Sequence, residues 1–159
     1  MNTKRTIENL GGLHPLFRPK AEDFLAAAQQ LLRDAGVSVE ILSGLRSWRQ
    51  QAALYASGRT KPGRIVTRAK PGTSWHNFGL AIDLGLFRDG RYLDEREPAA
   101  ADKLYASLAP VAGHFGLEWA GNWKTFSESP HYQWTNGNTL PGLRLQMEAN
   151  GYAAEKLLL

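Results

Sequence analysis

Apolar residues along the chain alternate between helical and strand-like spacing. Residues 20–35 carry them every three or four positions, which predicts an amphipathic helix that ends before Gly36. Residues 37–42 place Val, Val and Ile at every second position, as a half-buried strand does. The same two patterns predict further helices over 47–57 and 99–115 and a second strand over 80–84.

The remaining segments are shorter and richer in turn residues. Residues 88–91 read Arg-Asp-Gly-Arg, which predicts a turn between strand 80–84 and a short partner. Residues 117–134 predict a short strand, a loop and another strand. Residues 140–159 predict a docked amphipathic helix, with a frayed end as the alternative. Because these elements alternate without the long crossovers of a doubly wound sheet, we expect an α+β fold, a small antiparallel sheet with packed helices.

Length and composition fit a single domain over residues 1–159, of which 43% are hydrophobic. No apolar run approaches the roughly 18–20 residues that span a bilayer. The first residues lack the apolar stretch of a Sec signal peptide, so we expect synthesis in the cytoplasm and release by another route. The chain has no cysteine, so any bound metal must be held by His, Asp or Glu.

The net charge of +4 is unevenly distributed. Residues 1–75 carry 12 Lys and Arg against 5 Asp and Glu, whereas residues 76–159 carry 7 against 10. The densest basic stretch, residues 59–70, holds five cations and no acid. It is either a solvated loop or a contact for anionic polymers of a cell envelope. No nucleic-acid-binding module accompanies it, so we expect no nucleic-acid partner.

His76 and Asp83 form the first candidate site. On a strand over 80–84, Asp83 lies on the face opposite Leu80, Ile82 and Leu84. A carboxylate beside a buried strand is costly unless it is paired or binds a cation, and Gly79 allows a bend that returns His76 toward it. A His and a carboxylate are two of the three protein ligands of a typical catalytic zinc site. The alternative is an Asp that caps a turn beside a surface His.

Residues 128–132, Glu-Ser-Pro-His-Tyr, form a second candidate site. Pro130 fixes its own φ and favours an extended residue before it, so Glu128 and His131 lie at a turn that enters a strand. His131 is a candidate third metal ligand, and Glu128 is a candidate general base. An exposed Glu and a hydrogen-bonded strand-edge His are the alternative.

Arg46 lies in a Ser-Gly-Leu-Arg-Ser segment between a predicted strand and a predicted helix. Its planar guanidinium could stabilise an oxyanion or bind a substrate carboxylate, and Gln51 on the following helix could add an amide contact. A solvated Arg and a solvated Gln are the alternatives.

Together these segments resemble the LAS-type zinc peptidases of peptidoglycan, and among them the L-alanyl-D-glutamate endopeptidases of phage endolysins and of some bacterial cell-wall hydrolases. The family pattern reads Ser-Gly-(aromatic or apolar)-Arg-Ser, then Gln-x-x-Leu-Tyr-x-x-Gly-Arg, then Ser-x-His-x-x-Gly-x-Ala-x-Asp, and ends with acid-x-Pro-His-aromatic. The matching stretches here are residues 43–47, 51–59, 74–83 and 128–132.

The resemblance implies one zinc ion per chain with three ligands, His76, Asp83 and His131. It implies Glu128 as the general base and Arg46 as an electrophilic or substrate-orienting cation. Expected substrate contacts are Ser74, Gln51, Trp123 and Tyr132. Many relatives have Asp where Glu128 stands, and Glu can perform the same proton transfer.

The expected function is a zinc-dependent endopeptidase that cleaves the peptide stem of bacterial peptidoglycan, at the L-alanyl-D-glutamate bond. We expect a monomeric cell-wall lysin that reaches the wall by a holin-type route. One alternative is a D-alanyl-D-alanine carboxypeptidase or dipeptidase with the same site. Another is a non-catalytic zinc-bearing domain that binds the cell wall, against which the presence of Glu128 argues.

Overall fold

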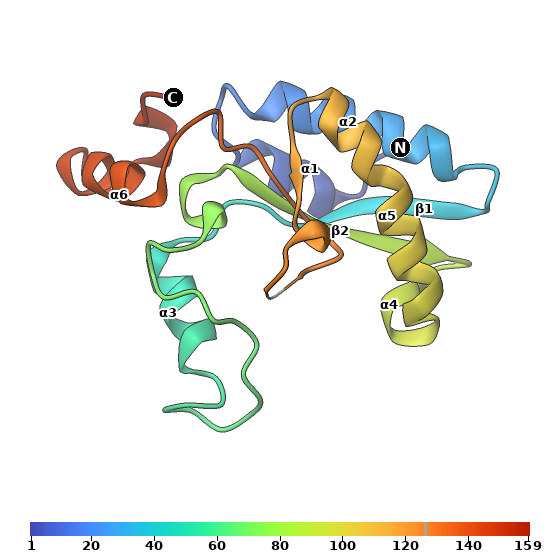
Figure 1. The fold of residues 1–159 in the computed structure, drawn as a ribbon, viewed down its shortest axis with the longest axis horizontal. Helices are drawn as coiled ribbons and strands as arrows, with labels where there is room; N and C mark the ends of the chain where they lie inside the picture. The colour runs from blue at the N-terminus through green and yellow to red at the C-terminus, as the bar shows by residue number, and fades with distance from the viewer. Residues whose placement is uncertain (126) are drawn as a thin grey trace.

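The fold is built on a five-stranded sheet with the strand order β1-β2-β5-β4, and β3 pairs with β2 as well. A computed structural model describes residues 1–125 and 127–159 (Figure 1). Every strand pair is antiparallel. The strands are β1 (Val37–Ser43), β2 (Ala81–Arg88), β3 (Arg91–Tyr92), β4 (Glu118–Trp119) and β5 (His131–Gln133). The predicted α+β class with a small antiparallel sheet is therefore confirmed.

Helices cover one face of this sheet and leave much of the other face for the site (Figure 1). The covering helices are α1 (Lys4–Gly11), α2 (Arg18–Leu32) and α5 (Pro98–His114). Their apolar side chains pack on a row of fully buried strand residues that includes Ile41, Ile82, Leu84, Leu86 and Tyr132. Of the two shorter helices, α3 (Trp48–Ala56) extends away from the sheet below it in this view, and α4 (Leu93–Arg96) packs against α5 and β2.

Helix α1 was not predicted from the sequence, and it protects the outer edge of β1. Arg5 donates two hydrogen bonds to the carbonyl of Leu42, and Asn9 donates one to the carbonyl of Ile41. The hydroxyl of Thr6 accepts a hydrogen bond from the backbone N–H of Ile41. An edge strand with unpaired backbone groups is a template for aggregation, and these side chains occupy the groups instead.

Local sequence explains most of the remaining boundaries. The turn predicted over 88–91 joins β2 to β3, with Asp89 and Gly90 at φ values of 51° and 72°. Two central residues of positive φ are typical of the type I′ turn, which matches the twist of a hairpin. Strand β2 extends four residues beyond the predicted 80–84, because it pairs with both β1 and β3 there.

The C-terminal segment differs from the single helix predicted over 140–159. Helix α6 (Leu140–Ala149) ends where Gly151 and Tyr152 both adopt positive φ, and a short 3-10 helix follows over Ala154–Lys156. The prediction of one continuous helix was therefore wrong, although Leu143, Met147 and Leu157 are all buried as a docked segment requires. No helix in the described part of the chain is long and apolar enough to cross a membrane.

Candidate metal centre and cleft

Three neighbouring strands bring Ser43, Asp83 and His131 into one row across the sheet. Asp83 is the register partner of Ser43 on β1 and of His131 on β5. Cross-strand partners project to the same face, so all three side chains leave the sheet on the side that the covering helices do not occupy. The alternation predicted for β2 is confirmed, since Ile82 and Leu84 are fully buried on the other face.

His76 reaches this row from a 3-10 helix, Trp75–Phe78, that directly precedes β2. Gly79 ends that helix at φ 67°, a left-handed conformation that glycine adopts without strain. A Cβ at this position would meet the backbone nitrogen of His14 at 2.9 Å, so the close approach also requires glycine. The predicted bend at Gly79 is thus confirmed, and it returns His76 to Asp83.

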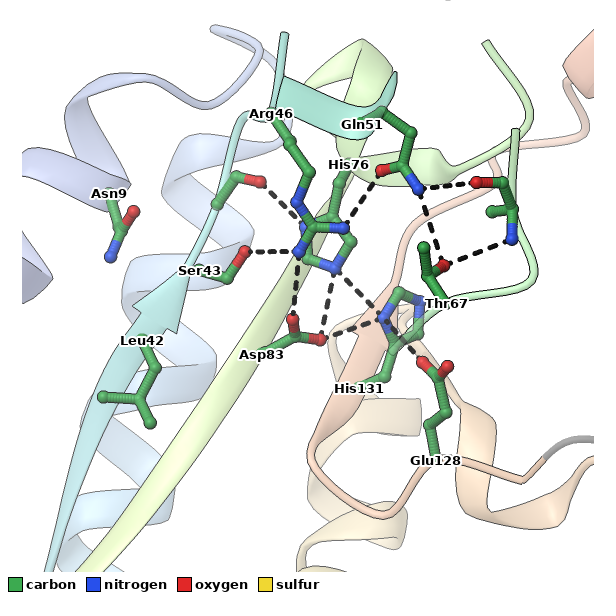
Figure 2. Close-up of polar contacts among 12 residues, drawn as sticks. Asn9, Leu42, Ser43, Arg46, Gln51, Thr67, His76, Asp83, Glu128 and His131 are labelled. Atoms are coloured by element: carbon green, nitrogen blue, oxygen red, sulfur yellow. Dashed lines mark hydrogen bonds and ion pairs between the residues drawn. The ribbon is translucent and has the colours of Figure 1, made fainter. Parts of the chain in front are cut away.

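The three side chains converge on one point (Figure 2). His76 Nε2 lies 3.1 Å from Asp83 Oδ1 and 3.2 Å from His131 Nδ1, and the last two atoms lie 3.0 Å apart. Each of these atoms is one that binds metal ions in proteins. Both imidazoles are buried, whereas the Asp83 side chain is 25% exposed, so the cluster opens to solvent on the side of the carboxylate.

The outer nitrogen of each imidazole is bound to an acceptor. His76 Nδ1 lies 2.8 Å from the carbonyl oxygen of Gly44, and His131 Nε2 lies 3.0 Å from Gln133 Oε1. Neither oxygen carries a hydrogen, so each ring nitrogen must donate. In its neutral form each imidazole would therefore turn a lone pair toward the Asp83 carboxylate, which is an arrangement that a cation stabilises.

The donor set fits a zinc ion. Nitrogen and oxygen ligands of tetrahedral zinc lie about 2.0–2.1 Å from the metal, which puts them about 3.3 Å from one another. The separations within the cluster, 3.0–3.2 Å, are close to that spacing. Two imidazoles and one carboxylate also leave the fourth position for water or substrate, as catalytic zinc sites do.

The charge of Asp83 also favours a positive charge beside it, on an imidazole or on a bound cation. Burial raises the pKa of Asp83, but the two imidazoles against it outweigh that effect and hold the pKa well below its usual value. Burial lowers the pKa of His131, but the hydrogen bond and the charge of Asp83 outweigh it and raise the pKa above 6.5. Both shifts arise because a carboxylate faces imidazoles at hydrogen-bond distance.

Arg46 lies at the edge of the cluster with its guanidinium held on two sides. Its Nη2 donates to Ser43 Oγ at 3.0 Å and its Nη1 to Gln51 Oε1 at 3.1 Å, and Nη2 lies 3.7 Å from Asp83 Oδ2 (Figure 2). Asn77 is fully buried, and its amide donates to the carbonyl of Arg46. The orientation of the guanidinium is therefore fixed by its neighbours before any substrate arrives.

Glu128 approaches the cluster from the turn before β5. The carbonyl of Ser129 accepts a hydrogen bond of 2.7 Å from the Trp119 indole, and that of Pro130 accepts one from the Leu84 backbone. The Glu128 carboxylate lies 3.8 Å from His131 Nδ1 and is 39% exposed. The Glu128 carboxylate is thus close to the candidate ligand atoms but beyond hydrogen-bond distance of them, as a general base for a bound water should be.

A cleft of about 920 Å³ surrounds the cluster. Its lining includes all of the predicted catalytic and ligand residues, together with Ser74 and Trp123. Trp123 is 37% exposed, with its ring centroid 5.5 Å from that of His131. The basic segment contributes residues 66–69, so part of it forms a wall of the cleft.

Two of the expected substrate contacts are buried and cannot touch a substrate. Tyr132 is fully buried on the helix-covered face, where its hydroxyl donates to the Tyr105 carbonyl. Gln51 is also fully buried, and its amide nitrogen donates to the Ala69 carbonyl at 2.8 Å. Neither side chain has surface for a substrate, because strand alternation turns the first into the core and hydrogen bonds occupy the second.

The other two histidines, His14 and His114, lie outside the cluster. His14 is buried, with Nε2 bonded to the Leu157 carbonyl, and His114 is exposed at the end of α5. Sequence reasoning missed three side chains or groups that support the site, namely the Gly44 carbonyl, Asn77 and Gln133. Of these, Gln133 carried a signal, since it lies two residues after His131 on a strand and so shares its face.

The fold and the converging donors define a metal-dependent peptidase. The chain belongs to the VanY family: the family model described as D-alanyl-D-alanine carboxypeptidase matches residues 14–137. The resemblance inferred from the motifs is thereby confirmed.

Similar proteins have related names. The peptidoglycan L-alanyl-D-glutamate endopeptidase CwlK of Bacillus subtilis (strain 168) is 39% identical over 127 residues, covering 76% of this chain and 72% of CwlK. The L-alanyl-D-glutamate peptidase of Listeria phage A118 is 32% identical over 116 residues, covering 71% of this chain but only 37% of the phage protein. The crystal structure of the Serratia marcescens L-Ala D-Glu endopeptidase ChiX superimposes with a TM-score of 0.54 at 25% identity, over 86% of this chain and 90% of ChiX.

Proposed function

We propose that this chain is a zinc-dependent endopeptidase that cleaves the L-alanyl-D-glutamate bond in the peptide stem of bacterial peptidoglycan. The observation that carries the proposal is the convergence of three donor atoms within 3.2 Å of one another, beside a carboxylate and a guanidinium in an open cleft. The names of CwlK, ChiX and the phage peptidase support the choice of substrate bond.

His76 Nε2, Asp83 Oδ1 and His131 Nδ1 would hold one zinc ion. Zinc bound there would act as a Lewis acid that polarises the scissile carbonyl and lowers the pKa of a water molecule. No cysteine competes for the ion, and the acceptor against the outer nitrogen of each imidazole favours the tautomer whose inner nitrogen can bind it.

Glu128 is proposed as the group that moves the proton. Its carboxylate takes the proton of the attacking water and then gives it to the amine that leaves, so one side chain serves both halves of the hydrolysis. Its partial exposure leaves it accessible to water, while the turn through Pro130 limits its movement.

Arg46 is proposed to stabilise the negative charge that develops on the carbonyl oxygen. A guanidinium held by Ser43 and Gln51 needs little reorganisation during the reaction, which is the condition under which such groups contribute most. Ser74 and Trp123, which line the cleft, are the proposed substrate contacts.

The family description favours one competing function, a D-alanyl-D-alanine carboxypeptidase with the same site. Mass spectrometry of the fragments released from purified peptidoglycan separates the two. Cleavage at L-alanyl-D-glutamate releases whole stem peptides that begin with D-glutamate, whereas carboxypeptidase action releases only free D-alanine. Release of free D-alanine alone would contradict the proposed endopeptidase.

A further inference from the structure

The imidazole of His131 is held from behind by a chain of polar side chains. His131 Nε2 lies 3.0 Å from Gln133 Oε1, and Gln133 Nε2 lies 3.3 Å from Glu118 Oε2. The other Glu118 oxygen accepts a hydrogen bond of 2.8 Å from the hydroxyl of Thr135. None of these three side chains belongs to the proposed catalytic set.

Strand register builds this chain. His131 and Gln133 lie two residues apart on β5 and therefore share a face. Glu118 on β4 is the register partner of Gln133, which puts the two side chains side by side. Gln133 is buried with 4% exposure, whereas Glu118 is exposed, so its charge stays in contact with water.

The hydrogen bonds between Glu118, Gln133 and His131 can run in one direction only. An ionised carboxylate accepts hydrogen bonds and cannot donate them, so Glu118 binds the NH₂ end of Gln133. This turns the carbonyl end of Gln133 toward His131, where it can only accept. The ring must then carry its hydrogen on Nε2, which leaves Nδ1 as a lone pair toward His76 and Asp83.

The two histidines of the cluster differ in how their outer nitrogens are fixed. His76 donates to the backbone carbonyl of Gly44, whose orientation the chain itself determines. Gln133 is an amide that can rotate by half a turn and present its NH₂ end instead, which would oppose the required tautomer. The carboxylate of Glu118 is the group that prevents this rotation.

We infer that Gln133 and Glu118 are positioning residues for the metal centre: they hold His131 in the tautomer whose Nδ1 can bind zinc. The inference rests on the proposed zinc-dependent function. Hydrogen-bonded groups behind a metal ligand typically contribute about 10–100-fold to metal affinity.

The test compares zinc affinities measured by competition with a chromogenic chelator. Gln133→Leu should bind zinc about 10–100-fold more weakly than wild type. Gln133→Glu alone should also weaken binding, because it sets a second carboxylate against Glu118. In the exchange variant Gln133→Glu, Glu118→Gln, the side chain at position 133 again accepts the hydrogen bond of His131, and its neighbour at position 118 is an uncharged amide. The zinc affinity of this variant should return to within a few-fold of wild type.

NMR of the zinc-loaded proteins supplies a readout that a packing defect alone would not give. The His131 Nε2–H should give a protected resonance in wild type and in the exchange variant, and this resonance should be lost in Gln133→Leu. Gln146→Leu is the matched control, because Gln146 also uses both ends of its amide, on the backbone of Leu158 far from the cluster. It should bind zinc as wild type does.

Two outcomes would overturn the inference. One is wild-type zinc affinity in Gln133→Leu. The other is a loss of affinity that the exchange variant does not recover. A wild-type protein that binds no zinc would contradict the proposed function itself, and the two failures are therefore distinguishable.

Discussion

Asp83 and His131 are register partners on two antiparallel strands, and their carboxylate oxygen and Nδ1 lie 3.0 Å apart. The pairing of β2 with β5 therefore brings together two of the three candidate ligand residues. Ligands on the strands of a scaffold are held more accurately than ligands on loops. His76 is added by the bend at Gly79 and Glu128 by the turn at Pro130.

Replacing Glu128 by Gln separates catalysis from metal binding. Gln keeps the size and hydrogen-bonding shape of the side chain but cannot take a proton from water. A positioned general base contributes about 10²–10⁴-fold in rate, so we expect a fall of that order in kcat on peptidoglycan fragments. Glu128→Asp should retain part of the activity.

Zinc content and thermal unfolding of Glu128→Gln should match wild type, since the carboxylate lies 3.8 Å from the nearest ligand atom. A Gln variant that loses its zinc would make Glu128 a ligand. A Gln variant with full activity would place the base elsewhere.

Replacing Gln51 by Leu tests whether this buried amide orients Arg46. The substitution keeps most of the side-chain volume but leaves Arg46 Nη1 and the Ala69 carbonyl without their partner. A buried donor or acceptor that loses its hydrogen-bond partner lowers the free energy of unfolding by about 1–3 kcal/mol. A displaced catalytic group can cost about 10²-fold in rate, so kcat/KM should fall by up to that factor with zinc content unchanged.

Gln30→Leu is the control for this variant, because Gln30 is an exposed glutamine of α2 far from the cleft. Activity assays of both variants measure the change in kcat/KM, and urea unfolding measures the change in the free energy of unfolding. Wild-type kcat/KM in Gln51→Leu would show that Arg46 keeps its position without the amide.

The basic segment, residues 59–70, contains cations with different surroundings. Arg59 stacks on the ring of Tyr55 and donates to the carbonyls of Tyr55 and Thr67, so it holds the loop together. Arg68 lines the cleft. Lys61 and Arg64 are exposed and lie outside the cleft lining, which makes them the suitable positions for a test of long-range attraction.

The double variant Lys61→Gln, Arg64→Gln should act more slowly on whole cell walls, and the salt dependence of its activity should be flatter. Exposed charges attract anionic surfaces over about 8–10 Å at physiological salt, and added salt screens this attraction. Turnover of a small soluble stem peptide should stay unchanged. An equal loss on both substrates would mean that the two cations shape the cleft.

Most of the fold was predictable because its signals are local. The spacing of apolar residues and the glycine stops predicted α2, α3, α5 and β1 close to their observed bounds, and the first half of β2. Helix α1 has few buried residues, among them Thr6 and Leu10, so it offers little apolar periodicity to detect. The C-terminal helix was predicted too long because the stop signal Asn150-Gly151 was not used: the helix ends at Ala149, and Gly151 adopts a positive φ.

The site was predictable where one short segment carries the chemistry, as for His76 with Asp83 and for Glu128 with His131. Tyr132 was misassigned although strand alternation after His131 already placed it on the opposite face. The burial of Gln51 was not readable from the sequence, because its partner is the Ala69 carbonyl in a loop without periodicity.

Zinc content per chain tests the central claim most directly. After dialysis against a weak chelator, atomic emission should find close to one zinc per wild-type chain and per His114→Ala chain, since His114 is exposed and outside the cluster. His76→Ala, Asp83→Ala and His131→Ala should each lose tight binding, because a catalytic zinc site typically depends on three protein ligands. Full zinc occupancy in the Asp83→Ala protein, or none in wild type, would contradict the proposed metal centre.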